Sequence, residues 1–229
     1  MKRTVSSREP ASPPDPRLAP AYTFREAAHY LRLPLPTLRS WCIGSGKTRP
    51  VFRMDDPRHQ FLSFMNMVEA HILSGMRRRH GVGLPQIRSA LAYVQKRCGV
   101  ERPLIDQSFQ TDGRFLFIDH LERLVNASKS GQLAIPDLLP RLARIERDAS
   151  GLPVRFYPCT RTGEACNPAS DPKIVVVNPQ ISFGRPSVGG VATSTIWSRF
   201  RAGDSPSHLA ADYGLPPEAI EEAIRCEAA

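Results

Sequence analysis

The 229-residue chain contains 31 lysine and arginine residues against 22 aspartate and glutamate residues, which gives a formal net charge of +9. Hydrophobic residues make up 41% of the chain, enough for packed cores and too many for disorder throughout. No apolar run is long enough to span a bilayer, and the proline-rich start lacks the core of a signal peptide. We therefore expect a cytoplasmic protein without membrane contact. The five cysteines are scattered and odd in number, unlike a secreted disulfide framework.

The positive charge is concentrated in the first half of the chain. Residues 1–103 hold 18 lysines and arginines against seven acidic residues, a net charge of +11, whereas residues 104–229 hold 13 against 15, a net of −2. This polarity is the electrostatic footprint expected of a nucleic-acid-binding domain joined to a part with another role. A solvated basic surface, or one that binds RNA or an acidic protein, would carry the same charge.

Residues 1–20 contain five prolines and few large apolar side chains. Such a segment can bury little surface, so we expect it to form a flexible arm. Its basic residues could add phosphate contacts, and an uninvolved tail is an equally good interpretation.

Residues 23–44 are predicted to form two helices joined by a tight turn. Thr23 and Glu26 have the spacing of a capping box at the start of the first helix. Pro34 ends that helix, because proline disfavours helix at the preceding residue, and Gly44 can close the second helix. Apolar residues at helical spacing are Phe24, Ala27, Ala28 and Leu31 in the first helix, and Leu35, Leu38, Trp41 and Cys42 in the second.

The polar face of the second helix carries Thr37, Arg39 and Ser40. A supporting helix, a turn and a second helix with a basic outer face make a helix-turn-helix candidate for DNA binding. An ordinary helical hairpin in a core is the alternative.

The segment after Gly44 is rich in basic residues around a short apolar piece, and its Asp-Asp-Pro sequence is a turn signal. It is interpreted as a small β-hairpin wing, which would give a second arm of DNA contacts. The candidate DNA-binding residues are therefore Thr37, Arg39 and Ser40 on the helix and Arg49, Arg53 and Arg58 on the wing.

Two further helices are predicted, at residues 63–80 and 84–98, the second opening with GVGLPQIRSAL and ending at Gly99. A helix-turn-helix, a basic wing and two more helices in this order resemble the DNA-binding half of MerR-like regulators, over residues 21–99. Such regulators usually continue into a long dimerising helix and an effector site. Neither is apparent in this sequence, which counts against a small-molecule sensor.

Residues 104–170 are expected to form a mixed α/β connecting region. A hairpin is predicted at residues 108–118, and a strand at residues 152–157. A helix is predicted to open at Pro136 and to end at Gly151, with one apolar face formed by Leu138, Leu139, Leu142 and Ile145.

No catalytic constellation is visible in the chain, so an enzyme is not expected. Cys159 and Cys166 are seven residues apart, with no histidine or third cysteine nearby. This spacing is poor for zinc, and we expect neither a metal site nor a cofactor.

The C-terminal segment is predicted to form a strand at residues 173–177 and then three helices, which make a second helix-turn-helix. A cap is expected at Thr193 or Thr195, with Ser205 and Gly214 bounding the middle helix. The last helix carries Glu218, Glu221, Glu222, Arg225 and Glu227. Four carboxylates would repel a phosphate backbone, so this copy is better suited to binding protein or to dimerising.

This segment resembles the small three-helix domain found in many bacterial toxin–antitoxin operons. The resemblance is carried by a GRP-x-x-x-G run, by Gly-Asp-Ser and by Asp-Tyr-Gly. These residues are Gly184, Arg185, Pro186 and Gly190, then Gly203, Asp204 and Ser205, then Asp212, Tyr213 and Gly214. The turn after Gly190, where the family usually has Thr-Arg-Ile-Pro, is diverged.

A MerR-like domain joined to this domain resembles the antitoxins of VapBC-type modules. The resemblance implies a PIN-domain ribonuclease toxin as partner, operator DNA as a second partner, and a homodimer. The residues that contact the toxin are not identified. Candidates for insertion into a toxin site are Arg185, Arg199, Arg201 and Arg225. The spacing of Trp197, Phe200 and Tyr213 favours positions in the core over a role as interface anchors.

The sequence thus predicts a mainly α (α+β) protein with an arm at residues 1–20, a winged helix-turn-helix at 21–103, a mixed α/β region at 104–170 and a helix-turn-helix domain at 171–229. The function indicated is an antitoxin that neutralises its toxin and represses its own operon. The alternative is a stand-alone MerR-like transcription regulator without a toxin.

Overall fold

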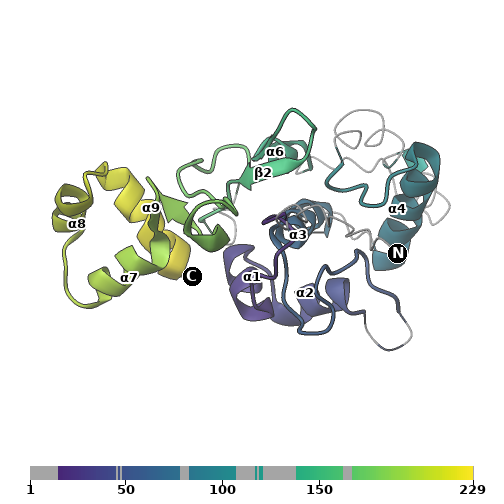
Figure 1. Ribbon diagram of the computed structural model, residues 1–229, viewed down its shortest axis with the longest axis horizontal. Coiled ribbons are helices and arrows are strands. Elements are labelled where there is room, and N and C mark those ends of the chain that lie inside the picture. Colours follow the sequence, from purple (N-terminus) through teal and green to yellow (C-terminus); the bar gives the residue numbers. More distant parts are fainter. Residues whose placement is uncertain are drawn as a thin grey trace, which may run out of the picture.

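The computed structural model describes residues 15–228 except for positions 45, 47, 78–82, 107–116, 118, 121–137 and 162–166. The described residues form eight α-helices and two small antiparallel sheets, a helix-rich mixture that fits the predicted fold class. Figure 1 shows α7, α8 and α9 together at one end and α4 at the other, with α1, α3, α6 and β2 in the middle. No described helix is long and apolar enough to cross a membrane.

The first two helices follow the predicted pattern closely. Helix α1 (Phe24–Tyr30) opens with the full capping box, since the Thr23 hydroxyl accepts from the Glu26 N–H while the Glu26 carboxylate accepts from the Thr23 N–H at 2.9 Å. Helix α2 (Leu35–Cys42) begins after the break at Pro34, and Gly44 follows it with a φ of +91°. The paired apolar faces are buried against each other, with Leu38 and Trp41 fully enclosed.

The segment predicted as a wing is held mainly by side chains. An isolated bridge joins Asp56 to Phe61, next to a bridge between Tyr22 and Leu62. The Asn66 side chain meanwhile donates to the Arg53 carbonyl at 2.8 Å and accepts from the Asp55 N–H at 3.2 Å. These contacts satisfy backbone groups that a two-stranded ladder would otherwise pair.

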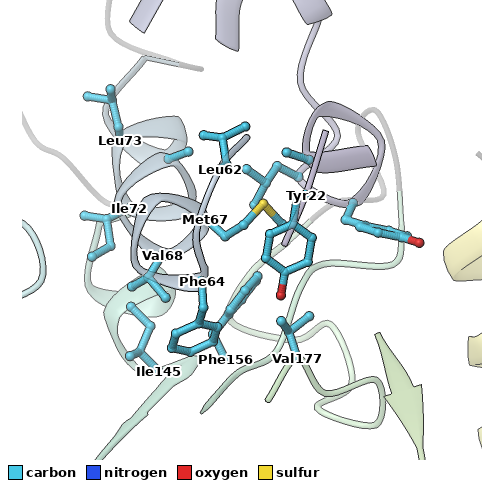
Figure 2. Packing of buried hydrophobic residues seen from close by; sticks show 14 of the residues in the cluster. Tyr22, Leu62, Phe64, Met67, Val68, Ile72, Leu73, Ile145, Phe156 and Val177 are labelled. Atoms are coloured by element: carbon cyan, nitrogen blue, oxygen red, sulfur yellow. The ribbon is translucent and has the colours of Figure 1, made fainter. Parts of the chain in front are cut away.

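Helix α3 (Phe64–Arg77) is the centre of the core. Figure 2 shows Phe64, Met67 and Val68 of this helix near side chains from distant segments, while Ile72 and Leu73 lie on another side of the helix and are also buried. The residues from distant segments are Tyr22 from the N-terminal part, Ile145 and Phe156 from the middle region, and Val177 from the C-terminal part. Helix α4 (Leu84–Cys98) has the predicted bounds, and Gly99 caps it in the left-handed conformation.

The middle region differs from the helix predicted there. Helix α6 spans only Leu138–Leu142, and Ile145 opens strand β1 (Ile145–Arg147), which pairs antiparallel with β2 (Pro153–Phe156). The predicted continuation to Gly151 is wrong, because Ile145 is buried opposite Phe156 against α3, a contact that the local helical spacing does not contain. Strand β2 confirms the predicted strand. The hairpin at residues 108–118 and the helix start at Pro136 lie outside the described residues, Phe117 excepted.

The C-terminal part contains the three expected helices. Strands β3 (Ser187–Val188) and β4 (Val191–Ala192) form a short hairpin, followed by α7 (Thr193–Arg201), α8 (Pro206–Tyr213) and α9 (Pro217–Ala228). Ser205 and Gly214 bound α8 as predicted. Thr193 is the first residue of α7 rather than its cap, and its hydroxyl donates to the Pro186 carbonyl at 3.1 Å. Residues 173–177 pair through isolated bridges in place of the predicted strand.

Candidate nucleic-acid interface

The outer face of α2 is accessible. Thr37 and Ser40 are half-buried and Arg39 is exposed, whereas Leu38 and Trp41 on the inner face are fully buried. The Arg39 guanidinium lies 5.3 Å from the centre of the Phe24 ring, within the range of a cation–π contact across the helix pair. This contact orients the side chain without neutralising its charge.

The three arginines predicted on the wing are also exposed. The Val51 N–H donates to the Trp41 carbonyl at 2.7 Å, which ties the segment that carries Arg49 and Arg53 to the end of α2. Arg53 lies between the buried side chains of Phe52 and Met54 and therefore points outward. In the described part of the chain, no carboxylate forms an ion pair with Arg49, Arg53 or Arg58, so their charges are available to an anionic partner. The structure thus gives the six predicted residues solvent access, and it links the α2 and wing groups through the backbone.

A partly buried ion network, with Glu69 at its buried end, packs behind this segment. Arg102 donates to Asp55 at 3.0 and 3.1 Å and to Glu69 at 3.1 and 2.6 Å. Burial is the main influence on the Glu69 carboxyl and raises its pKa, while the hydrogen bonds from Arg102 oppose that rise. The sequence patterns predicted a role for neither Arg102 nor Asn66. The available signal for this network was Glu69, an acidic residue next to the apolar stripe of a helix that is buried almost throughout.

A cavity of about 1080 Å³ separates the wing segment from α4. Its lining contains four arginines, namely Arg49, Arg53, Arg88 and Arg102, together with Asp55, Glu69 and Glu101. The Arg88 Nε and Nη2 atoms are buried without a hydrogen-bond partner. Two of these arginines, Arg49 and Arg53, are the exposed arginines of the predicted wing segment.

The C-terminal part is joined directly to the first helix pair. Arg32, in the turn between α1 and α2, has a φ of +54° and donates to the carbonyls of Arg225 at 3.0 Å and Cys226 at 2.8 Å in α9. The Tyr22 hydroxyl donates to the Gly184 carbonyl in a buried position. These contacts fix the C-terminal helices against α1 and the following turn.

The predicted acidic outer face of α9 is smaller than expected. Glu222 is only 4% exposed and is bonded to Thr160, Arg161 and Arg225, so its placement on an outer face is wrong. Glu227 is half-buried and accepts from the Thr193 hydroxyl. The structure leaves Glu218 and Glu221 exposed on this helix.

The arginines considered as inserts are engaged to different degrees. Arg199 pairs with Asp204 and Asp212, and Arg225 pairs with Glu222. Arg201 is exposed, with its guanidinium 5.7 Å from the centre of the Trp197 ring. Arg185 is 52% exposed.

The three aromatic residues of this part are half-buried, and Phe200 and Tyr213 pack against the core. Cys159 is buried, whereas Cys166 lies outside the described residues. Among the residues that the structure describes, no group of three or more histidine, cysteine or acidic side chains is placed to hold a metal ion.

Comparison with known proteins adds a family context. Residues 175–225 match the family model described as "Protein of unknown function (DUF433)". A Mycobacterium tuberculosis protein named "Putative antitoxin VapB45" is 27% identical over 92% of this chain and 95% of its own. "Uncharacterized protein Rv2308" from the same organism is 26% identical over 89% of this chain and 88% of its own.

A solved structure has the same fold. The crystal structure of Rv2018 from Mycobacterium tuberculosis superimposes with a TM-score of 0.64 at 26% identity, covering 90% of this chain and 98% of that one. The similarity therefore extends from the N-terminal helix pair to α9 and is not confined to the C-terminal segment. These findings support an antitoxin-like protein and leave the MerR-like layout as a prediction.

Proposed function

We propose that the protein is an antitoxin that binds operator DNA with one surface and a PIN-domain ribonuclease toxin with another. The observation that carries this proposal is that a relative named "Putative antitoxin VapB45" aligns with 92% of the chain at 27% identity. Its place of action would be the cytoplasm, where both the operator and the RNA targets of a ribonuclease are found.

The DNA-binding role is assigned to residues 21–103. In this proposal, Thr37, Arg39 and Ser40 on α2 enter the major groove, while Arg49, Arg53 and Arg58 contact phosphates from the wing. The support is the solvent access of all six side chains and the available charge of the three wing arginines. A homodimer would match a palindromic operator, because the spacing of two half-sites mirrors the two-fold axis of the protein.

The toxin-binding role is assigned to residues 171–229. The described acidic side chains of this part are largely turned inward or paired, so charge alone does not define its interface. The first test of this role is therefore a measurement of toxin binding by the wild-type chain, without a substitution.

The deciding experiment uses the gene next to the one that encodes this chain. Expression of that neighbour alone should arrest growth, and co-expression with this chain should restore growth and yield a complex that co-purifies. An unrelated antitoxin expressed at the same level is the control and should give no rescue. A neighbour that is harmless alone and does not co-purify would overturn the antitoxin assignment and favour the stand-alone regulator.

A further inference from the structure

A tight turn at residues 181–184 has an unfavourable backbone for its sequence. The Gly184 N–H donates to the Ile181 carbonyl at 2.9 Å, which closes the turn, and both central residues have positive φ, +49° at Ser182 and +54° at Phe183. Successive positive φ values are typical of type I′ turns, which favour Asn-Gly because a bulky side chain is disfavoured there. A phenylalanine at this position is an outlier that local folding preferences do not explain.

Burial does not explain the phenylalanine either. The Phe183 side chain is 92% exposed, the highest value among the large exposed hydrophobic residues of the described chain. Ile181, in the same turn, is 36% exposed. An apolar ring held in solvent on a strained backbone adds nothing to the stability of the isolated chain, and such strain is typical of functional sites.

The base of the turn is rigid. Asn178 holds the segment before it, accepting from the Gln180 N–H at 2.9 Å and from the Ile181 N–H at 3.0 Å. On the other side, the Tyr22 hydroxyl donates to the Gly184 carbonyl, and a Cβ added at Gly184 would lie 2.5 Å from that hydroxyl oxygen. The ring is therefore presented on a preorganised backbone, which lowers the entropic cost of binding.

We propose that Phe183 is an anchor that inserts into an apolar pocket with an acidic rim on the toxin. This inference rests on the proposed function. The acidic rim is argued from Arg185, which lies next to the turn, is 52% exposed, and pairs only at 3.5 Å with Glu26. Aromatic side chains that fill partner pockets dominate the binding energy of many protein interfaces. DNA is a poorer occupant, because the half of the chain that contains this turn has a net charge of −2.

The test is the substitution Phe183→Gly in the full chain, measured against the purified product of the neighbouring gene. Glycine accepts positive φ, so the melting temperature should be unchanged or higher. The dissociation constant of the complex, measured by calorimetry, should rise by about 30-fold or more. The matched control is Leu139→Ala, which removes another exposed apolar side chain, on helix α6, and should bind like the wild type.

The possible results separate the inference from the proposed function. Wild-type affinity for Phe183→Gly overturns the anchor and leaves the antitoxin assignment intact. A wild-type chain that does not bind the neighbour at all overturns both. A lower melting temperature for Phe183→Gly would give the ring a role in folding and overturn the anchor. Light scattering after gel filtration, without toxin, tests whether a second copy of this chain is the occupant. A wild-type dimer that is lost in Phe183→Gly would overturn the toxin pocket. Weaker operator binding with unchanged toxin binding would mean that the Phe183 ring contacts DNA, and would overturn the toxin pocket.

Discussion

The Arg32 Nη2 atom donates to the Cys226 carbonyl oxygen over 2.8 Å, across 194 positions of sequence. The acceptor lies in the last turn of α9, where carbonyls lack intrahelical donors and the helix dipole is negative. A guanidinium there satisfies the helix end and complements its charge. The turn of the predicted DNA-binding helix pair is thereby connected to the part assigned to the toxin.

Replacing Arg32 should separate two effects. Arg32→Ala removes the hydrogen bonds to α9 and retains a Cβ at positive φ, so we expect a loss of about 1.5–3 kcal/mol in the free energy of unfolding. Arg32→Gly removes the same bonds but relieves the backbone, so it should be about 0.5–1 kcal/mol more stable than Arg32→Ala. Urea denaturation of both variants measures the difference. Equal stability would show that the positive φ at Arg32 carries no cost.

Substitutions in the Asp55–Arg102–Glu69 network should have non-additive effects on the free energy of unfolding. Arg102→Ala leaves Glu69 as an uncompensated buried acid, and removing one partner of a buried pair typically costs about 3–5 kcal/mol. Adding Glu69→Gln to Arg102→Ala should recover part of that loss, because the amide carries no charge. Chemical denaturation of the two single variants and the double variant tests this coupling. Additive effects would mean that Glu69 and Arg102 do not depend on each other.

Local signals accounted for much of the fold. The Thr23–Glu26 capping box and helix α4, bounded by Leu84 and Gly99, depend on contacts within a few residues, and the structure confirms both. The outer face of α2 followed from helical periodicity in the same way. Accessible positions could therefore be assigned in the candidate site from sequence alone.

The errors come from contacts between distant residues. Ile145 fits a helical stripe locally, but its burial opposite Phe156 makes it a strand residue. Glu222 fits an acidic helix face, but its partners Thr160 and Arg161 come from the middle region some 60 positions earlier. Arg32 was missed for the same reason, because nothing near it in sequence indicates that it meets the end of α9.

Asp148 should control part of the acid stability. It accepts hydrogen bonds from the Ser150 hydroxyl and N–H, the Leu152 N–H and the Arg17 guanidinium, and these lower its pKa from the ordinary 3.8 to about 2. A carboxyl with a lowered folded-state pKa stabilises the fold above its unfolded value, and that contribution disappears as the pH falls from about 4 to about 2. Asp148→Asn should therefore flatten this part of the pH profile of unfolding. Glu221→Gln, which changes an exposed acid on α9, should retain the wild-type slope; an unchanged slope in Asp148→Asn would contradict the assignment.

The wing arginines should set the salt dependence of operator binding. Each phosphate contact adds about 0.9 to the slope of log affinity against log salt concentration, so Arg53→Ala should weaken binding and reduce that slope by about 0.9. Arg39→Ala, on α2, should cost about 1–3 kcal/mol and relax the preference for operator over unrelated DNA.

The matched control is Arg97→Ala, because Arg97 is an exposed arginine near the end of α4 and its loss changes the net charge by the same amount. Fluorescence anisotropy with operator DNA at several salt concentrations gives the affinities and slopes. If Arg97→Ala lowered the affinity and the salt slope as much as Arg53→Ala, the basic half would bind DNA through its overall charge and not through the wing. Wild-type affinity and slope in both Arg39→Ala and Arg53→Ala would place the DNA-binding surface elsewhere on the chain.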